Sequence, residues 1–369
     1  MLKTKIMLAS NLVSIALLIV LVWQWQQLYM NKEEPVQLVN EQEAMGVLKP
    51  YLERRKEEGI DYKFVRTGIF IQSMGFTKTS EILINGYVWL KFQRGMHDDV
   101  ERGFRFPDVT NIALELVKIK SYERHIDNDI VEGWYFEAKL RQDMSYMNYP
   151  FDNQTIRVRL NPNSFNSSII LVPDYSSYTA TGLNDIFGIE SSVILDSWEL
   201  NNSYFNYVIT RYDTNFGIPA NVISKDLPDL TFNIDIRRRF ISVLIIHLLP
   251  VLFVVTLLYG VLITIDGNRE RMSRHGFNAA TIIGTCISLI ALFVAMHVQL
   301  RQEFAGYGFV YLEYFYLLVY LLLTFACANA FLYTMEWSKF FHQRNNLYIK
   351  VGYWPLVLFL LVAITFMVM

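Results

Sequence analysis

Small hydroxyl side chains recur at helical spacing in one otherwise apolar segment, residues 278–300. Steps of three and four residues place such side chains on a single face of a helix. Hydroxyls along a face, followed by a leucine further along it, suit a water-filled pore with an apolar constriction. The predicted pore-lining residues are Thr281, Thr285, Ser288, Leu292, Ala295 and Gln299.

Two other interpretations of this segment stay open. Small and hydroxyl residues also mediate helix packing inside membranes, without any pore. A second stripe at helical spacing would line a drier pore, and we favour the polar one. The second stripe consists of Ala280, Gly284, Ile287, Ala291 and Val294.

Other chemistry is poorly represented along the chain. The sequence has no HExxH or GxSxG motif, no phosphate-cradling glycine loop and no cluster of Cys and His. The stretch "HDDVE", residues 97–101, offers oxygen ligands for a cation such as calcium, but a solvated acidic loop is the better interpretation. A net charge of -2 gives no basic surface for nucleic acid. We therefore expect no enzymatic activity, no cofactor, no metal site and no nucleic-acid partner.

Five apolar runs must position the polar stripe. The chain of 369 residues is 53% hydrophobic, which is too apolar for an ordinary soluble protein. Each run approaches the roughly 20 residues that cross a bilayer, so contact with membrane lipid is expected. The runs are residues 6–25, 240–265, 278–298, 307–333 and 351–369.

The first run predicts an uncleaved membrane anchor. Lys3 and Lys5 precede it, as they would in a signal peptide. No small residues that would form a cleavage site follow it, and Trp23 and Trp25 suit a membrane interface. The first run therefore adds a helix to the four that follow the polar region.

Basic residues between the later runs predict their orientation. The positive-inside rule places both of the loops that carry these residues in the cytoplasm. We expect a multi-pass protein of the cell (inner) membrane, with a cytoplasmic N-terminus and with its polar region and C-terminus outside. The basic residues are Arg269, Arg271 and Arg274 in one loop and Lys339, Arg344 and Lys350 in the other.

Residues 62–237 predict an exported β domain. Short runs rich in Val, Ile, Tyr and Phe, such as "EILINGYVWLKF", alternate with turn residues, which favours an antiparallel β-sandwich. Cys286 and Cys327 both lie in apolar runs, so disulfides cannot support this domain. The expected order is an anchor at 1–30, a charged helical linker at 31–61 that is a solvated spacer, the sandwich at 62–237 and a four-helix membrane domain at 238–369.

The loop "NYPFDNQT", residues 148–155, carries more specific residues than a plain turn needs. Proline after an aromatic residue readily takes the cis form and fixes a bend, which would present the phenyl ring of Phe151 to an apolar surface. By itself the loop would be a rigid turn in which Asp152 caps local amides. Two other stretches stand out, "FRFPDV" at 104–109 and "YVWL" at 87–90, and Arg238 precedes Pro250 by twelve residues.

In their order and spacing, these features resemble the pentameric ligand-gated ion channels, the Cys-loop receptor superfamily, in their prokaryotic form. The loop matches the family's aromatic-Pro-Phe-Asp-x-Gln signature, and Gln142 and Ile156 stand where animal members have cysteines. "FRFPDV" is similar to the family's aromatic-x-Pro-Asp turn, and Arg238 with Pro250 to the start of its first channel helix. The resemblance covers most of the chain from residue 62 onwards, and the N-terminal anchor departs from it.

The resemblance implies a homopentamer gated by a small-molecule or ionic ligand that binds between neighbouring β domains. Aromatic residues would line that site, Trp89 on one face and four residues on the other, and an aromatic box favours a cationic amine. Simple packing is the alternative role for each of them. The four are Tyr175, Tyr178, Tyr212 and Phe216.

The resemblance also assigns roles near the membrane. The coupling residues would be Tyr149, Pro150, Phe151, Asp152 and Arg238, with Phe151 against the outer ends of the helices and Asp152 paired with Arg238. The glutamate typical of the family's cation channels is missing at the inner end of the pore, so charge selectivity stays unassigned, with a slight lean to anions. A non-conducting receptor that signals through a periplasmic partner is the alternative function.

Overall fold

The computed structural model describes residues 2–30, 36–56, 62–109, 116–163, 168–183, 185–214, 226–265, 279–334 and 347–369. These residues form two compact units. The helical unit comprises residues 1–32, 145–152 and 238–369, and the β unit comprises residues 33–144 and 153–237. The predicted coupling loop thus belongs to the helical unit, although strands precede and follow it in the chain.

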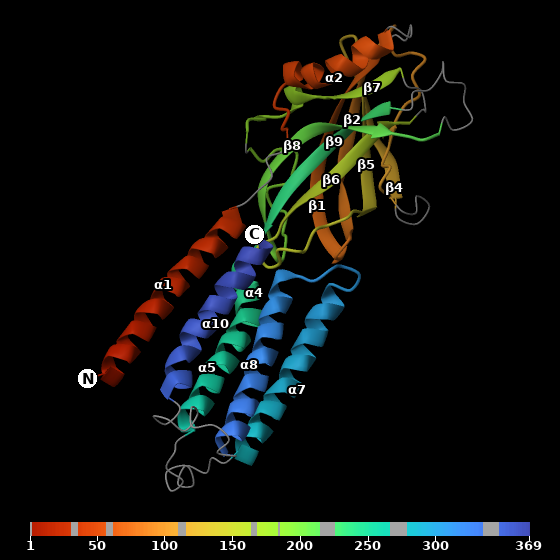
Figure 1. The fold of residues 1–369 in the computed structure, drawn as a ribbon. Coiled ribbons are helices and arrows are strands. Elements are labelled where there is room, and N and C mark those ends of the chain that lie inside the picture. The colour runs from red at the N-terminus through yellow and green to blue at the C-terminus, as the bar shows by residue number, and fades with distance from the viewer. Residues whose placement is uncertain are drawn as a thin grey trace. The chain divides into compact units, whose positions relative to one another are not determined.

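Two sheets form the β unit (Figure 1). The strands of the first, in spatial order, are β4 (Leu116–Ile126), β5 (Asp129–Arg141), β2 (Glu81–Gln93), β1 (Lys63–Lys78) and β7 (Ile169–Pro173). The second contains β3 (Phe104–Arg105), β6 (Asn153–Pro162), β9 (Asp226–Arg238) and β8 (Trp198–Arg211). Aromatic rings from the two sheets meet in the core, as Phe104 of β3 and Trp134 of β5 do at a centroid distance of 5.8 Å.

One strand pair corrects the expectation of a wholly antiparallel sandwich. β7 runs parallel to β1, with Lys63 opposite Ile169 and Thr67 opposite Pro173. β7 follows β6, which belongs to the other sheet, so it reaches β1 by a crossover and not through a tight hairpin. The sheet is therefore mixed.

The segment before the sandwich is not a solvated spacer. Helix α2 (Glu41–Lys56) buries Ala44, Leu48 and Tyr51 to 6% exposure or less. These residues are four and three positions apart, so they form one apolar face, and Figure 1 shows α2 lying over β7. The Tyr51 hydroxyl also donates to the Asp226 carbonyl at 3.0 Å. The charged residues thus occupy only the outer face of a packed helix.

The helical unit contains α1 (Leu2–Met30), α4 (Phe240–Val243), η2 (Leu244–Leu248), α5 (Leu249–Thr264), α7 (Ala279–Glu303), α8 (Tyr311–Thr334) and α10 (Leu347–Val368). Five stretches of the described chain are helices long and apolar enough to cross a membrane, which indicates a membrane protein. They are residues 4–30, 240–264, 280–303, 311–332 and 347–368. Most of the basic residues used to predict their orientation lie outside the described residues.

The helix that begins at Phe240 widens just before its proline. Residues Leu244–Leu248 form a π-helical turn, and Pro250 stands at the start of the next α-helical stretch. Proline has no amide hydrogen and its ring clashes with the carbonyl four residues earlier, so the regular hydrogen-bond pattern cannot continue through it. The buried His247 lies in this turn.

Candidate functional site

Residues 145–152 cap the first turn of α8. The Tyr149–Pro150 peptide bond is cis. The backbone amide of Tyr311 donates to the Met147 carbonyl at 2.8 Å, and that of Leu312 donates to the Tyr149 carbonyl at 3.2 Å. The first amides of a helix have no partner inside the helix, so these carbonyls satisfy groups that would otherwise be unpaired. The loop is thereby fixed to the start of α8.

A buried ion pair joins the same loop to Arg238, the last residue of β9, two residues before α4 begins. Arg238 donates through Nε to Asp152 Oδ1 at 2.7 Å and through Nη2 to Oδ2 at 3.0 Å. Both side chains are less than a tenth exposed. A bidentate pair fixes the orientation of both groups, and at this depth neither charge can be left without the other cheaply. The structure therefore brings together the two residues that the sequence comparison paired.

Tyrosines of the loop contact the end of α7. The ring of Tyr149 lies 4.6 Å from that of Phe304 and 6.2 Å from His247, and the guanidinium of Arg238 lies 4.7 Å from the centre of the Tyr149 ring. Tyr146 packs against Phe304 at 5.1 Å. Burial raises the pKa of the Tyr149 hydroxyl well above its usual value. These contacts connect the loop to Phe304, which directly follows α7.

Phe151 occupies an aromatic pocket on the outer ends of the helices. Its ring stacks on Phe240 at 5.2 Å and lies 6.0 Å from the ring of Tyr311. Only 5% of Phe151 is exposed. Residues 145–152, which we call the coupling loop, thus contact the beginning of α4 at Phe240, the residue after α7 at Phe304 and the beginning of α8 at Tyr311.

A second ion pair holds the connection between α7 and α8. Glu313 is 1% exposed and accepts a hydrogen bond from the Val310 amide at 2.8 Å. Its carboxylate also lies 3.4 Å from the guanidinium of Arg301, which donates to the carbonyls of Tyr307 and Gly308. Because Tyr146 packs on Tyr307 at 5.0 Å, this rigid connection is also a contact surface for the coupling loop.

The predicted pore helix exposes its polar stripe. All six predicted pore-lining residues of α7 are exposed in the protomer, whereas Ile282, Cys286, Phe293 and Leu300 face the bundle and are buried. The hydroxyls of Thr285 and Ser288 donate to the carbonyls of Thr281 and Gly284 in their own helix, at 2.9 and 3.0 Å. Hydroxyl oxygens retain lone pairs for water or ions in this arrangement. The second stripe is exposed as well, so exposure in the single chain does not decide between the two predicted stripes.

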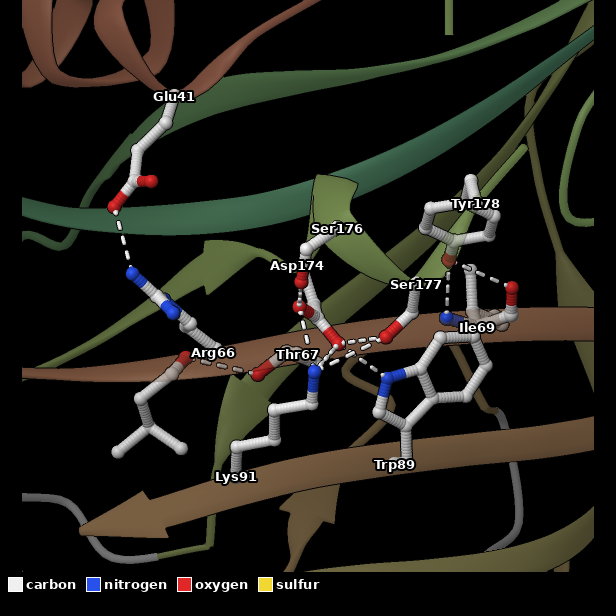
Figure 2. A network of polar contacts seen from close by, with 11 residues as sticks. Glu41, Arg66, Thr67, Ile69, Trp89, Lys91, Asp174, Ser176, Ser177 and Tyr178 are labelled. Carbon is white, nitrogen blue, oxygen red and sulfur yellow. Dashed lines mark hydrogen bonds and ion pairs between the residues drawn. The ribbon is translucent and has the colours of Figure 1, made fainter. Parts of the chain in front are cut away.

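The indole ring of Trp89 packs over a glycine. Its N–H group donates to an aspartate (Figure 2). It lies on β2 opposite Gly68 of β1, and a Cβ on Gly68 would come within 2.1 Å of the indole ring. The indole Nε1 donates to Asp174 Oδ2 at 2.8 Å, and Lys91 donates to Asp174 Oδ1 at 3.0 Å. Asp174 is 1% exposed. Burial opposes its charge, but hydrogen bonds from Lys91, Ser177, Trp89 and Ser176 outweigh that effect and lower its pKa.

The predicted ligand-binding aromatics are engaged in the packing of one protomer. Tyr178 lies 5.6 Å from Trp89, and its hydroxyl accepts from the Ile69 amide and donates to the Ile69 carbonyl (Figure 2). Trp89 and Tyr178 therefore lie together and not on opposite faces, because β1 alone separates β2 from β7. The Tyr175 hydroxyl donates to the Leu38 carbonyl at 3.0 Å. Tyr212 is half-buried after β8, and Phe216 lies outside the described residues.

Other motifs singled out in the sequence have structural partners. Asp108 of "FRFPDV" forms an ion pair with Arg159, whose guanidinium also contacts Asp229 at 3.4 Å. In "HDDVE", Asp99 pairs with Lys63. In the part of the chain that the structure describes, no group of three His, Cys, Asp or Glu side chains is arranged to hold a metal ion.

Comparisons with known proteins do not assign the chain to a family. No protein-family model matches the sequence, and a search of curated proteins finds no significant match. The functional argument thus depends on the residues and contacts described above.

Proposed function

We propose that the chain forms a homopentameric ligand-gated ion channel of the Cys-loop receptor superfamily, with α7 lining its pore. One observation carries the proposal: the coupling loop contacts the ends of three successive helices. Phe151 packs on Phe240 and Tyr311, and Tyr149 packs on Phe304 directly after α7. The loop is also held by the buried pair of Asp152 with Arg238, two residues before Phe240. The chain leaves this loop directly into β6 at Asn153 and enters Arg238 from β9. Any rearrangement of those strand ends would therefore act on the helices that surround the pore.

The exposure of α7 supports the same proposal. In the most apolar stretch of α7 only 17% is buried within the single chain, compared with 50% in the corresponding stretch of α8. A helix that carries exposed hydroxyls and contacts its own bundle along one stripe is suited to a central position among several copies. Five copies would place the polar stripe, the second stripe or both around an axial pore.

Conductance and mass test the proposal. Purified wild-type protein in gentle detergent is expected to have five times the mass of one chain, and a monomer or dimer would contradict it. In planar bilayers, Leu292→Ser should raise the resting conductance, because a hydroxyl replaces the apolar constriction.

A matched substitution distinguishes the two stripes. Ile287→Ser changes a similar aliphatic side chain on the second stripe, and Ile287 is 60% exposed, as Leu292 is 54% exposed. If only Leu292→Ser raises conductance, the polar stripe lines the pore. If only Ile287→Ser does, the second stripe lines it. If neither variant conducts although both assemble, the non-conducting receptor replaces the channel.

A further inference from the structure

Helix α1 packs along α10 through one narrow stripe. The less exposed residues of α1 follow a spacing of three and four, typical of a helix seam, and include Ser10, Leu21, Gln24 and Leu28. Ser10 Oγ donates to the Val351 carbonyl at 2.5 Å, near the start of α10, and Gln24 Nε2 donates to the Val362 carbonyl at 3.4 Å, near its end. The two helices therefore run side by side in the same direction, as Figure 1 shows in red and blue.

Trp25 connects α1 to two helices of the bundle. Its indole Nε1 donates to the Tyr311 hydroxyl at 2.8 Å. That hydroxyl is also 2.6 Å from Thr365 Oγ1 on α10, and Tyr311 and Thr365 are almost fully buried. Polar groups in an apolar interior are costly unless they are paired, so this chain of hydrogen bonds fixes Trp25 at the start of α8 and the end of α10.

The ring of Trp25 also completes the pocket of Phe151. Its centroid lies 5.8 Å from Phe151, 6.4 Å from Phe240 and 6.3 Å from Phe315. Phe151 is thus enclosed by Phe240, Tyr311 and Trp25, and the last of these comes from outside the four-helix domain. Without Trp25, one side of the Phe151 ring would lose its aromatic neighbour.

The neighbouring tryptophan has a different environment. Trp23 lies two positions earlier on α1 and is 56% exposed, as are most of the large apolar residues away from the seam. The sequence suggests the same interfacial role for both tryptophans, whereas the structure directs only Trp25 into the bundle. A pure membrane anchor would need no such contact.

We propose that α1 is part of the coupling machinery, with Trp25 as a positioning residue that holds Phe151 against the outer ends of the helices. This inference rests on the proposed channel function for its effect on gating. Trp25 fixes the aromatic pocket through its ring and fixes Tyr311 through its N–H group. Because the Tyr311 amide bonds to the Met147 carbonyl, loosening Trp25 would loosen the coupling loop.

Hydrogen exchange measures the positioning without any need for conductance. In full-length Trp25→Leu protein, the amides of Tyr311 and Leu312 are expected to exchange several-fold faster than in the wild type, because their acceptors in the coupling loop are less firmly held. Trp23→Leu is the matched control and should leave both rates unchanged. Trp25→Phe keeps a ring and loses the N–H donor, so it should recover part of the protection. Unchanged exchange in Trp25→Leu would overturn the positioning role.

Ion flux measures the effect on gating. The same substitutions are placed in the Leu292→Ser channel, which is expected to conduct without a ligand, and flux from proteoliposomes is compared. Trp25→Leu should change the resting flux at least twofold, and Trp23→Leu should not. Faster exchange with unchanged flux would show that α1 is only a structural support, which overturns the coupling role. If only Ile287→Ser conducts, that variant serves as the background instead. If neither variant conducts, the channel proposal fails, and the exchange result alone decides whether Trp25 holds the loop.

Discussion

The helical unit and the β unit each contain a buried aspartate beside aromatic rings, and the two aspartates are held in different ways. Asp152 has a bidentate partner in Arg238, which lies 86 residues away in the chain and is itself buried. Asp174 accepts hydrogen bonds from Trp89, Lys91 and two serines, and the Lys91 side chain is 22% exposed. Asp152 thus has a bidentate charged partner, whereas Asp174 accepts hydrogen bonds from several smaller groups.

The two aspartates also differ in the segments that their contacts connect. Asp174 follows β7, and its contacts with Trp89 and Lys91 reach β2 across the intervening strand β1, so they connect parts of one hydrogen-bonded sheet. The contacts of Asp152 join the coupling loop to Arg238, the last residue of β9, whose backbone amide also donates to the Asp152 carbonyl at 3.4 Å. Asp152 is thus held at the end of a strand, just before a helix begins, whereas Asp174 is held within one sheet. The predictions below compare the effects of disturbing the two sites.

Breaking the Asp152 pair should have the largest effect. Asp152→Asn removes the carboxylate that accepts two hydrogen bonds from the buried Arg238 guanidinium, and breaking a buried pair typically costs about 3–5 kcal/mol. Asp174→Asn is the comparison, because Lys91 can turn towards water and the remaining donors can still bond to the amide oxygen. Thermal unfolding in detergent should show a markedly lower midpoint for Asp152→Asn. A larger loss for Asp174→Asn would contradict the distinction between the sites.

Crowding the Trp89 ring should be the next largest effect. Gly68→Ala places a methyl group within 2.1 Å of the indole, so the ring must leave Asp174 or the strands must separate. Overpacking of this kind costs about 1–3 kcal/mol. Gly75→Ala on the same strand is the control, since a Cβ there meets nothing within 4 Å. Equal unfolding midpoints for the two variants would show that the Trp89 contact does not stabilise the sheet.

Protonation of His97 should have the smallest effect. Burial, with Lys63 and Arg102 nearby, lowers the pKa of His97 below its ordinary value of 6.5. The folded protein then binds fewer protons than the unfolded chain, so this contribution to stability is complete above about pH 6.5 and is lost as the pH falls below it. His97→Gln should flatten the dependence of the unfolding midpoint on pH between about pH 7 and pH 5. The same substitution at the exposed His125 should leave the slope unchanged, and a slope unaffected by His97→Gln would refute the assignment.

Local patterns in the sequence predicted most of the elements. Five apolar runs correspond to the five long helices, because length and composition alone identify such helices. The alternating run "EILINGYVWLKF" falls within β2. In β9 apolar and polar residues also alternate from Leu230 to Ile236, but the structure buries both kinds, which the alternation alone does not predict.

Long-range packing could not be predicted from such patterns. The parallel pairing of β7 with β1 depends on a crossover between sheets, which no local period encodes. The apolar face of α2 was visible at Ala44, Leu48 and Tyr51, but its charged residues favoured a solvated helix. Trp23 and Trp25 have the same residue type and similar neighbours, and only the packing of α1 distinguishes them.

The candidate site, too, could be predicted only in part from the sequence. The pair of Asp152 with Arg238 was anticipated through the family resemblance, since 86 residues separate the two partners. The capping of α8 by Met147 and Tyr149 uses backbone carbonyls, and the side-chain pattern of the loop carries no information about them. A family resemblance can thus indicate which segments are in contact, but only a structure shows the individual contacts between them.

The most direct test of the coupling role is a charge exchange across the Asp152 pair, measured as resting ion flux in the Leu292→Ser background. Asp152→Arg and Arg238→Asp each place like charges together and should each change the flux several-fold. The double variant restores an ion pair with the charges reversed, and we predict that it returns the flux towards that of Leu292→Ser alone. If the double variant is as altered as the sum of the single ones, the pair does not transmit motion to the pore, and the central claim is wrong.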